Sequence, residues 1–330
     1  MKPEFFRVLC SPLFALALLA LATLPLWMPS YYLNIAILTL IYVALALAWN
    51  IVGGIAGQIS LAHSLFVGAG AMVASALLMK FGLNMWLGAL VAALVSAALG
   101  ACIAWLDFRF RLGHLSFALI TLAFAEMGEL IVLGWDFLGG ASGIYLPKDT
   151  GQLVQFQFGG SSGSFWVMLI LATVCLIVNL AVLNSPLGYF LRTIRDNEHA
   201  AQAIGVALLR NKMLAMVISA VLSSLIGTAY ARYISFVDPY LLASPVLTIE
   251  IVLFATIGGL GTVFGPVIGA GLLVPLGEIL RGQLGGALPG MHYFIYGVVL
   301  IAVILGTPRG LAPLFGRWTR RLIVRPPRAG

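Results

Sequence analysis

The chain of 330 residues is 62% hydrophobic and only 9% charged, whereas roughly a quarter of the residues in a soluble domain carry charge. A soluble protein of this composition would expose large apolar patches, so the composition excludes that class and selects a membrane protein. The net charge of +7 indicates cytoplasmic loops and contact with anionic lipid rather than nucleic acid, because Lys and Arg gather on the cytoplasmic side of membranes.

Long runs of Leu, Ala, Ile and Val without strict alternation predict spanning helices rather than a barrel. We therefore expect an all-α polytopic membrane protein with about ten transmembrane helices, some of them broken or re-entrant. An apolar run of about twenty residues at the start is long for a signal peptide and favours an uncleaved first span. In chain order the predicted spans are 8–27, 32–54, 60–80, 85–106, 113–134, 165–184, 213–236, 246–262, 263–281 and 292–308.

The distribution of basic residues predicts that the N- and C-termini are both cytoplasmic. The loop 135–164, which is rich in Gly, Ser and Asp, would then be periplasmic, and the opposite side would carry fewer basic residues. The predicted cytoplasmic segments hold Lys2 and Arg7, Arg109 and Arg111, the stretch 192–212, and an Arg-rich C-terminal tail.

Two glycine-rich segments resemble each other: "GGIAGQISLAHSLFVGAGA" begins at Gly53 and "GGLGTVFGPVIGAG" at Gly258. Transporters often carry broken helices at matching positions of two internal repeats, although glycine is common enough in membrane helices for chance to explain the likeness. The predicted spans give both segments the same orientation, which does not fit an inverted repeat. Candidate glycines for helix breaks or close packing are Gly53, Gly54, Gly57, Gly258, Gly259, Gly261, Gly265 and Gly269.

A few polar residues inside the spans are candidates for a translocation path. Gln58, Ser60 and His63 would line a cavity or a half-helix end, or else hydrogen-bond between packed helices. Glu126 and Glu129 share one helix face and would either line a path or lie near a helix end among polar neighbours. Glu250 and Glu278 lie near the edges of predicted spans, which favours a structural interpretation.

The sequence contains no Walker A pattern, no H-E-x-x-H and no G-x-S-x-G, so we do not expect an enzyme. Cys10, Cys102 and Cys175 match neither a metal motif nor a disulfide framework. We expect no metal site and no cofactor bound by this chain.

The stretch 185–212 interrupts the apolar pattern with six of the chain's 29 charged residues. Ser185 and Pro186 read as the start of a short helix to Arg195, and Asp196 or Asn197 as the N-cap of a second one. Gly205 fits the position that ends such a helix, which predicts a helix over 197–204. Its small apolar face would suit a groove on a partner, or the segment is only a solvated loop; that face would comprise Ala200, Ala201 and Ile204.

The segment "RTIRDNEHAAQAIGV" resembles the cytoplasmic loop of ABC-transporter permeases of the branched-chain amino-acid class. That superfamily carries Glu-Ala-Ala, three variable residues and Gly, and the positions here are His199, Ala200, Ala201 and Gly205, with the leading Glu absent. Both glycine-rich segments and "FVDPYLLASPVLTIEIVLF" are also similar to the family, in the family's order. The resemblance covers about 32–308 and is closest to the LivM-type subunit.

This resemblance implies one permease domain over 1–330 in a bacterial inner membrane, working with other chains. The partners would be a second homologous permease, two cytoplasmic ATPases that hold ATP and Mg²⁺, and a periplasmic binding protein. The ATPases would dock on the loop 185–212 through Arg195, Asp196, Glu198, His199, Ala200, Ala201 and Gly205.

The implied substrates are Leu, Ile and Val, with urea or another small amide as an alternative. A different class, an ion-gradient-driven secondary transporter, would use Glu126 and Glu129 as coupling acids.

Overall fold

The computed structural model describes residues 12–284, apart from 111–112, 148, 150 and 152–155, together with a few positions between 295 and 311. Seven helices in this part of the chain are long and apolar enough to cross a membrane. They are Ser30–Ile55, His63–Phe81, Met85–Phe110, Leu115–Gly134, Ser161–Asn184, Leu208–Ile234 and Pro239–Gly259. The chain is therefore a polytopic helical membrane protein, as its composition predicts.

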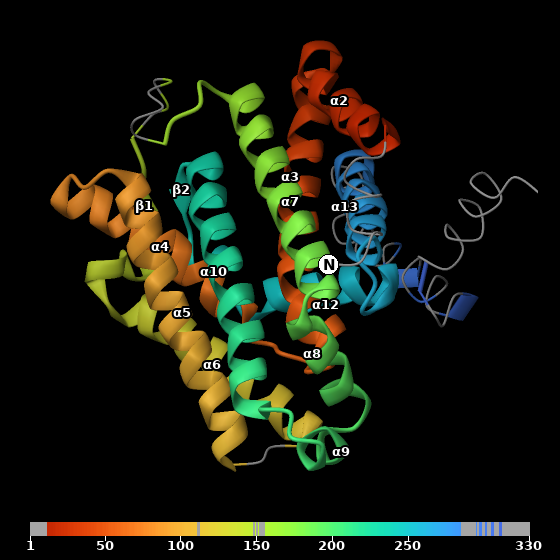
Figure 1. The fold of residues 1–330 in the computed structure, drawn as a ribbon. Helices are drawn as coiled ribbons and strands as arrows, with labels where there is room; N and C mark the ends of the chain where they lie inside the picture. Colours follow the sequence, from red (N-terminus) through yellow and green to blue (C-terminus); the bar gives the residue numbers. More distant parts are fainter. Residues whose placement is uncertain are drawn as a thin grey trace, which may run out of the picture.

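Most of the described residues belong to helices, which run largely along one direction in Figure 1. The helices are α2 (Pro12–Trp27), α3 (Ser30–Asn50), α4 (His63–Phe81), α5 (Met85–Phe110), α6 (His114–Gly134), α7 (Ser161–Asn184), α8 (Pro186–Asp196), α9 (Glu198–Ala203), α10 (Leu208–Ile234), α11 (Pro239–Leu242), α12 (Pro245–Gly259) and α13 (Gly265–Leu284). A π-helical turn, Ile51–Ile55, extends α3, and the short 3-10 turns are Asp136–Leu138 and Gly140–Ser142.

The prediction of about ten spans is confirmed for seven of them. The run 8–27 corresponds to α2, whose described part begins at Pro12, and its first residues lie outside the described part. The run 263–281 corresponds to α13, a 20-residue helix that is not among the seven and that contains Pro275, Glu278 and Arg281. Most of the run 292–308 lies outside the described residues.

Helices α3 and α10 form the centre of the bundle. Helix α10 packs against α4 and α5, and α3 packs against α7 and α13. The most apolar 18-residue stretch is 72% buried in the span that contains α3 and 67% buried in α10, whereas that of α6 is only 28% buried. Large apolar side chains such as Leu94 and Leu119 point outwards from α5 and α6, as expected for helices that face lipid.

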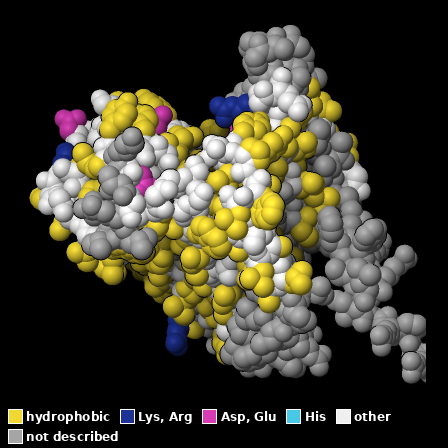
Figure 2. All heavy atoms as spheres, turned by 90° about the horizontal axis from the view of Figure 1, so that it is seen from above, with side chains coloured by type: hydrophobic (Ala, Val, Ile, Leu, Met, Phe, Trp, Pro, Cys, Tyr) yellow, Lys and Arg dark blue, Asp and Glu magenta, His cyan; other side chains and the backbone are white. Residues whose placement is uncertain are grey.

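The space-filling view in Figure 2 looks down on the end of the molecule opposite α9. Hydrophobic side chains dominate this view and charged ones are few. The surface agrees with a chain of which only 9% is charged.

One small β-ladder adds to the expected all-α architecture. Strand β1 (Ile144–Tyr145) pairs antiparallel with β2 (Phe236–Val237), with Ile144 opposite Val237. Next to this ladder, Arg232 Nη1 donates a hydrogen bond to Pro147 O over 2.8 Å. These bonds fasten the predicted exterior loop 135–164 to the end of α10 that lies away from α9 (Figure 1).

Candidate functional site

The two short helices of the charged stretch form where their caps predict. Ser185 Oγ accepts from Gly188 N at the start of α8, with Pro186 in the first turn. Asn197 Oδ1 accepts from Ala200 N over 3.0 Å at the start of α9. Gly205 follows α9 with φ of 86°, a conformation that glycine adopts without strain. Helix α9 is thus slightly shorter than the predicted 197–204.

The apolar face expected for this helix is divided between the inside and the outside of the molecule. Ala201 is fully buried in a small cluster with Ile194 and Leu208. Ala200 is exposed, and Ile204, just after the helix, is 74% exposed. Helix α9 therefore rests on α8 and α10 through Ala201, while the other two residues of the expected face, Ala200 and Ile204, face outwards.

A buried lysine connects α9 to the interior of the bundle. Lys212 Nζ lies 2.8 Å from Glu198 Oε1 on α9 and 3.0 Å from Asp107 Oδ2 on α5. The side chains of Lys212 and Asp107 are only 2% and 1% exposed, whereas that of Glu198 is 37% exposed. Two charges so deeply buried are stable only as a pair with good hydrogen-bond geometry.

The same carboxylate reaches the first glycine-rich segment. Gln58 Nε2 donates to Asp107 Oδ2 over 2.8 Å, and Gln58 is itself buried. Sequence reasoning assigned Gln58 to a path and Glu198 to a docking loop. The structure places both residues at the ends of one chain of hydrogen bonds that runs through Lys212 and Asp107.

Arg195 forms a second link from the charged stretch to the glycine-rich segments. Its Nη1 donates to Gly54 O over 3.2 Å, and its aliphatic carbons lie where a side chain at Gly57 would stand. Asn50 Oδ1 accepts from Gly261 N over 3.2 Å, and a methyl group on Gly54 would collide with both of these residues. The two similar glycine-rich segments thus touch each other next to Arg195.

Glycines also allow α12 and α13 to approach closely. A methyl group on Gly258 would collide with the backbone of Gly265 and crowd Gly269 N, and one on Gly265 would collide with Gly259 O. Gly53 packs in the same way against the ring of Trp49. These contacts are those of closely packed backbone, whereas a role of the glycines in breaking helices stays a prediction.

The remaining polar residues proposed for a path lie elsewhere. His63 is fully buried, and its Nε2 lies 2.7 Å from Ser219 Oγ on α10. Ser60 O accepts from Trp49 Nε1 over 2.8 Å. Glu126 is exposed and Glu129 half-exposed on α6, the least buried of the seven spans. His63 and Ser60 hold α4 against α3 and α10.

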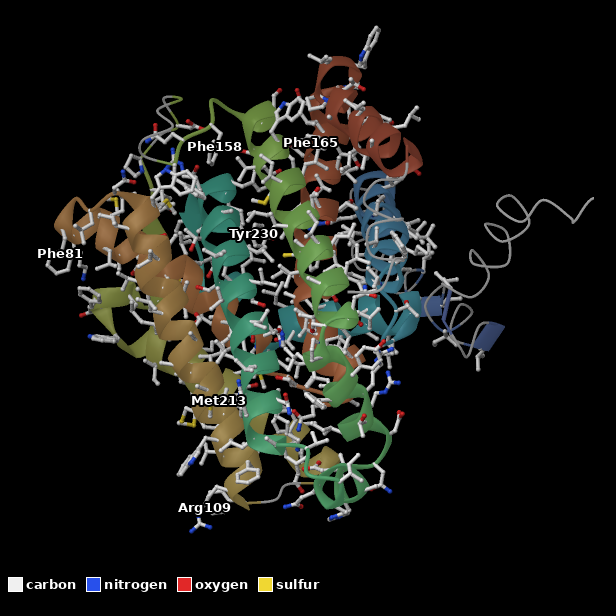
Figure 3. The ribbon with its side chains drawn as sticks, viewed as in Figure 1. Phe81, Arg109, Phe158, Phe165, Met213 and Tyr230 are labelled. Carbon is white, nitrogen blue, oxygen red and sulfur yellow. The ribbon has the colours of Figure 1, made fainter. Side chains whose placement is uncertain are left out.

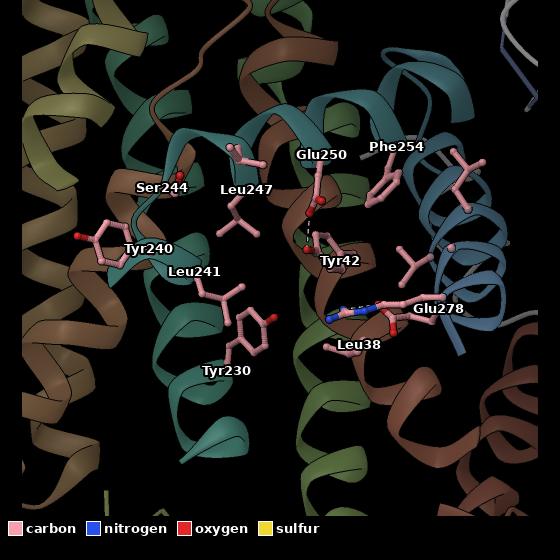
Figure 4. A pocket seen from close by; sticks show the side chains of 15 residues that line it. Leu38, Tyr42, Tyr230, Tyr240, Leu241, Ser244, Leu247, Glu250, Phe254 and Glu278 are labelled. Carbon is pink, nitrogen blue, oxygen red and sulfur yellow. Dashed lines mark hydrogen bonds and ion pairs between the residues drawn. The ribbon is translucent and has the colours of Figure 1, made fainter. Parts of the chain in front are cut away.

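A cavity of about 500 Å³ opens among α3, α10, α11, α12 and α13 (Figure 4). Tyr42 on α3 donates a hydrogen bond to Glu250 Oε2 on α12 within it. Its polar lining includes Tyr42, Tyr230, Tyr240, Glu250, Glu278 and Arg281.

Two acidic residues for which the sequence favours a structural interpretation lie at this cavity, and that interpretation stays a prediction. Glu250 and Glu278 line one cavity although they belong to different helices. An acidic residue inside the apolar segment Pro239–Gly259 is the signal that would have identified Glu250, because such residues in spans usually face the bundle interior.

Comparison with known families shows to which family the chain belongs. The family described as "Branched-chain amino acid transport system / permease component" matches residues 31–304. The chain belongs to this family. It is accordingly a multi-pass membrane permease of the bacterial ABC-transporter type, and it is not itself catalytic.

Individual relatives support the same assignment. The chain is 29% identical over 328 residues to the high-affinity branched-chain amino acid transport system permease protein LivM of Salmonella typhimurium, covering 92% of this chain and 75% of that one. The LivM protein of Escherichia coli matches with the same identity and coverage. The probable LivM of Methanocaldococcus jannaschii is 22% identical over 238 residues, with 69% of this chain and 68% of that one covered.

One solved structure is also similar, PsaBC from Streptococcus pneumoniae in complex with Fab. It has a TM-score of 0.46 at 14% identity and covers 88% of this chain and 94% of that chain.

Proposed function

We propose that this chain is the permease of an ATP-driven importer for Leu, Ile and Val. A periplasmic binding protein delivers the amino acid, and a second homologous permease completes the membrane passage. Two ATPase subunits hold ATP and Mg²⁺ on the cytoplasmic side and dock against α8 and α9. Family membership supports this assembly, and the LivM proteins, which cover most of the chain, support the substrate.

The distribution of charge supports the orientation of the proposed permease. Arg109 lies at the far end of α5, at the same end of the molecule as α9 (Figure 3). Arg192, Arg195 and Arg210 belong to the segments around α9. An end rich in arginine is expected to face the cytoplasm, where the ATPases would be.

The observation that carries the coupling role is the position of Lys212. It binds Glu198 on α9 and Asp107 on α5 at once, and Asp107 in turn holds Gln58. A displacement of α9 by an ATPase would therefore move groups inside the bundle, not only a surface loop. Arg195 adds a parallel connection from α8 to Gly54.

Two substitutions on the outer side of α9 test this role. Ala200→Asp and Gly205→Asp place a charge where the ATPase would dock. Ala200 is exposed, and nothing lies near Gly205, although its φ of 86° means that Asp there also strains the backbone after α9. We expect ATP hydrolysis to continue while leucine uptake into proteoliposomes falls at least about tenfold, with normal membrane insertion. Ala141→Asp, an exposed position in the loop at the other end, is the matched control. Normal coupling in both α9 variants would rule out the docking role.

Reconstitution with the ATPases and the binding protein tests the substrate. We expect leucine, isoleucine and valine to compete for uptake of labelled leucine, and urea not to compete. Uptake by the chain alone, driven by an ion gradient and altered in its pH profile by Glu129→Gln, would instead favour a secondary transporter.

A further inference from the structure

The cavity combines three kinds of lining. Glu250 and Glu278 provide carboxylates, and Arg281 provides a guanidinium group. Tyr42, Tyr230 and Tyr240 provide hydroxyls, and the rest of the wall is mostly apolar, including Leu241, Leu247, Phe254 and Leu273. Its volume of about 500 Å³ lies within the range of about 300–1,000 Å³ that is typical of small-molecule sites.

Glu250 is set up as an acceptor inside the cavity. It is half-buried on α12, and Tyr42 from α3 donates to its Oε2, which fixes the position of the carboxylate. An ionised carboxylate has acceptor sites for several hydrogen bonds, so one tyrosine leaves capacity for a ligand. Figure 4 shows the Glu250 side chain pointing from α12 towards Tyr42.

Among the described residues that line the cavity, the basic one is Arg281 on α13. The Arg281 side chain is 66% exposed, and its Nη1 is 3.9 Å from Glu278 Oε1. An ion pair this long and this exposed contributes little stability. A carboxylate on a ligand can therefore take the place of Glu278 as the partner of Arg281.

We propose that this cavity binds the substrate itself, as an α-amino acid zwitterion with an apolar side chain. Glu250 receives the ammonium group, Arg281 receives the carboxylate, and Leu241, Leu247 and Phe254 enclose the branched side chain. The inference rests on the proposed function and adds the place and the groups of recognition. Ligands without an ammonium group, such as urea or a 2-oxo acid, offer no cation to the Glu250 carboxylate, and urea also offers no carboxylate to Arg281, so we expect the site to reject them.

The location of the cavity fits a step in transport. It is formed partly by α12 and α13, the two helices whose glycine-rich turn touches Gly54. Arg195 from α8 binds Gly54 at the same turn. A movement of the charged stretch can therefore reach the helices that hold the ligand.

Leucine uptake by the complete reconstituted complex, measured beside its ATP hydrolysis, tests the site. We expect Glu250→Gln to lower leucine uptake at least about tenfold, the loss that fits a hydrogen bond to a charged group. Tyr42→Phe should give a smaller loss, and Glu250→Asp should recover part of the activity. Leu247→Trp, which fills the cavity without removing a charged group, should also block uptake while ATP hydrolysis continues.

Asp136→Asn is the matched control, because it likewise replaces a carboxylate by an amide, at an exposed position outside the cavity; it should leave uptake unchanged. Wild-type rates in both Glu250→Gln and Leu247→Trp would overturn the site, whether the cavity then holds lipid or water. Failure of the proposed function is separate, because it would show as absent leucine uptake in the unaltered complex. Co-purification of every variant with its partner subunits confirms that each one is assembled.

Discussion

Lys212 shows how much depends on a single buried charge. It neutralises Asp107 where both side chains are almost fully buried, and its bond to Glu198 reaches the surface. Removing one partner of a buried pair costs about 3–5 kcal/mol, because the other charge stays buried without compensation. The pair therefore fixes α10 against α5 as well as connecting α9 to the interior.

This argument predicts the behaviour of three variants at the residue scale. Lys212→Met should lower the melting temperature of the purified protein clearly, since it strands Asp107. The double variant Asp107→Asn with Lys212→Met should regain most of the loss, because no buried charge remains. Glu198→Gln, on a side chain that is 37% exposed, should melt near the wild-type temperature. Equal melting of Lys212→Met and the wild type would contradict the argument.

At the scale of elements, one carboxylate gathers several backbone N–H groups of the segment that precedes α7. Asp149 accepts backbone hydrogen bonds from Gly151, Phe158, Gly159 and Gly160. Burial alone would raise the pKa of Asp149, but these hydrogen bonds outweigh it, and the pKa lies below its ordinary value. The carboxylate thus stays ionised in the folded loop and closes the turn before α7.

A carboxyl group with a lowered folded pKa stabilises the fold above its unfolded pKa, and this contribution is lost as pH falls through the folded value. The closed turn should therefore be equally stable from pH 8 to about pH 5, and open only in stronger acid. Asp149→Asn should remove the effect and speed hydrogen exchange of the loop several-fold at pH 7. Hydrogen exchange followed by mass spectrometry, corrected for intrinsic rates, measures this; an unchanged loop in the variant would count against it.

At the scale of the whole molecule, the two ends differ in what they present. One end carries α9 and α8, which holds Arg192 and Arg195, and the other carries the β1–β2 ladder and the loop 135–164. The proposed orientation places the first end in the cytoplasm and the second in the periplasm.

Labelling of introduced cysteines tests this orientation. Gln202→Cys on α9 and Ala141→Cys in the loop are both at exposed positions. In spheroplasts, an impermeant thiol reagent should modify Ala141→Cys directly and Gln202→Cys only after permeabilisation. The unaltered chain measures the background from the native cysteines. The opposite pattern would place α9 outside and remove the ATPase contact.

Features that depend on interactions between residues close together in the chain follow from the sequence alone. Uninterrupted apolar runs that are long enough to cross a bilayer predict the spans, because a helix satisfies its own backbone hydrogen bonds. The starts of α8 and α9 were also predictable, since Ser185 and Asn197 each bond a backbone group three residues away. Helix α13 contains Pro275 and Glu278, which interrupt its apolar run, so the sequence predicts a span less clearly there.

Which polar groups meet depends on how the helices pack, and this is visible in the folded structure alone. Lys212 and Asp107 are 105 residues apart in the chain, and Tyr42 and Glu250 are 208 apart. No local periodicity records such pairs, because helix packing sets them and the cost of burying an unpaired charge in an apolar medium selects them. For that reason the sequence did not indicate Asp107, the bond between Tyr42 and Glu250, or the bond from the Gln58 amide to Asp107. A path role for Gln58 stays a prediction.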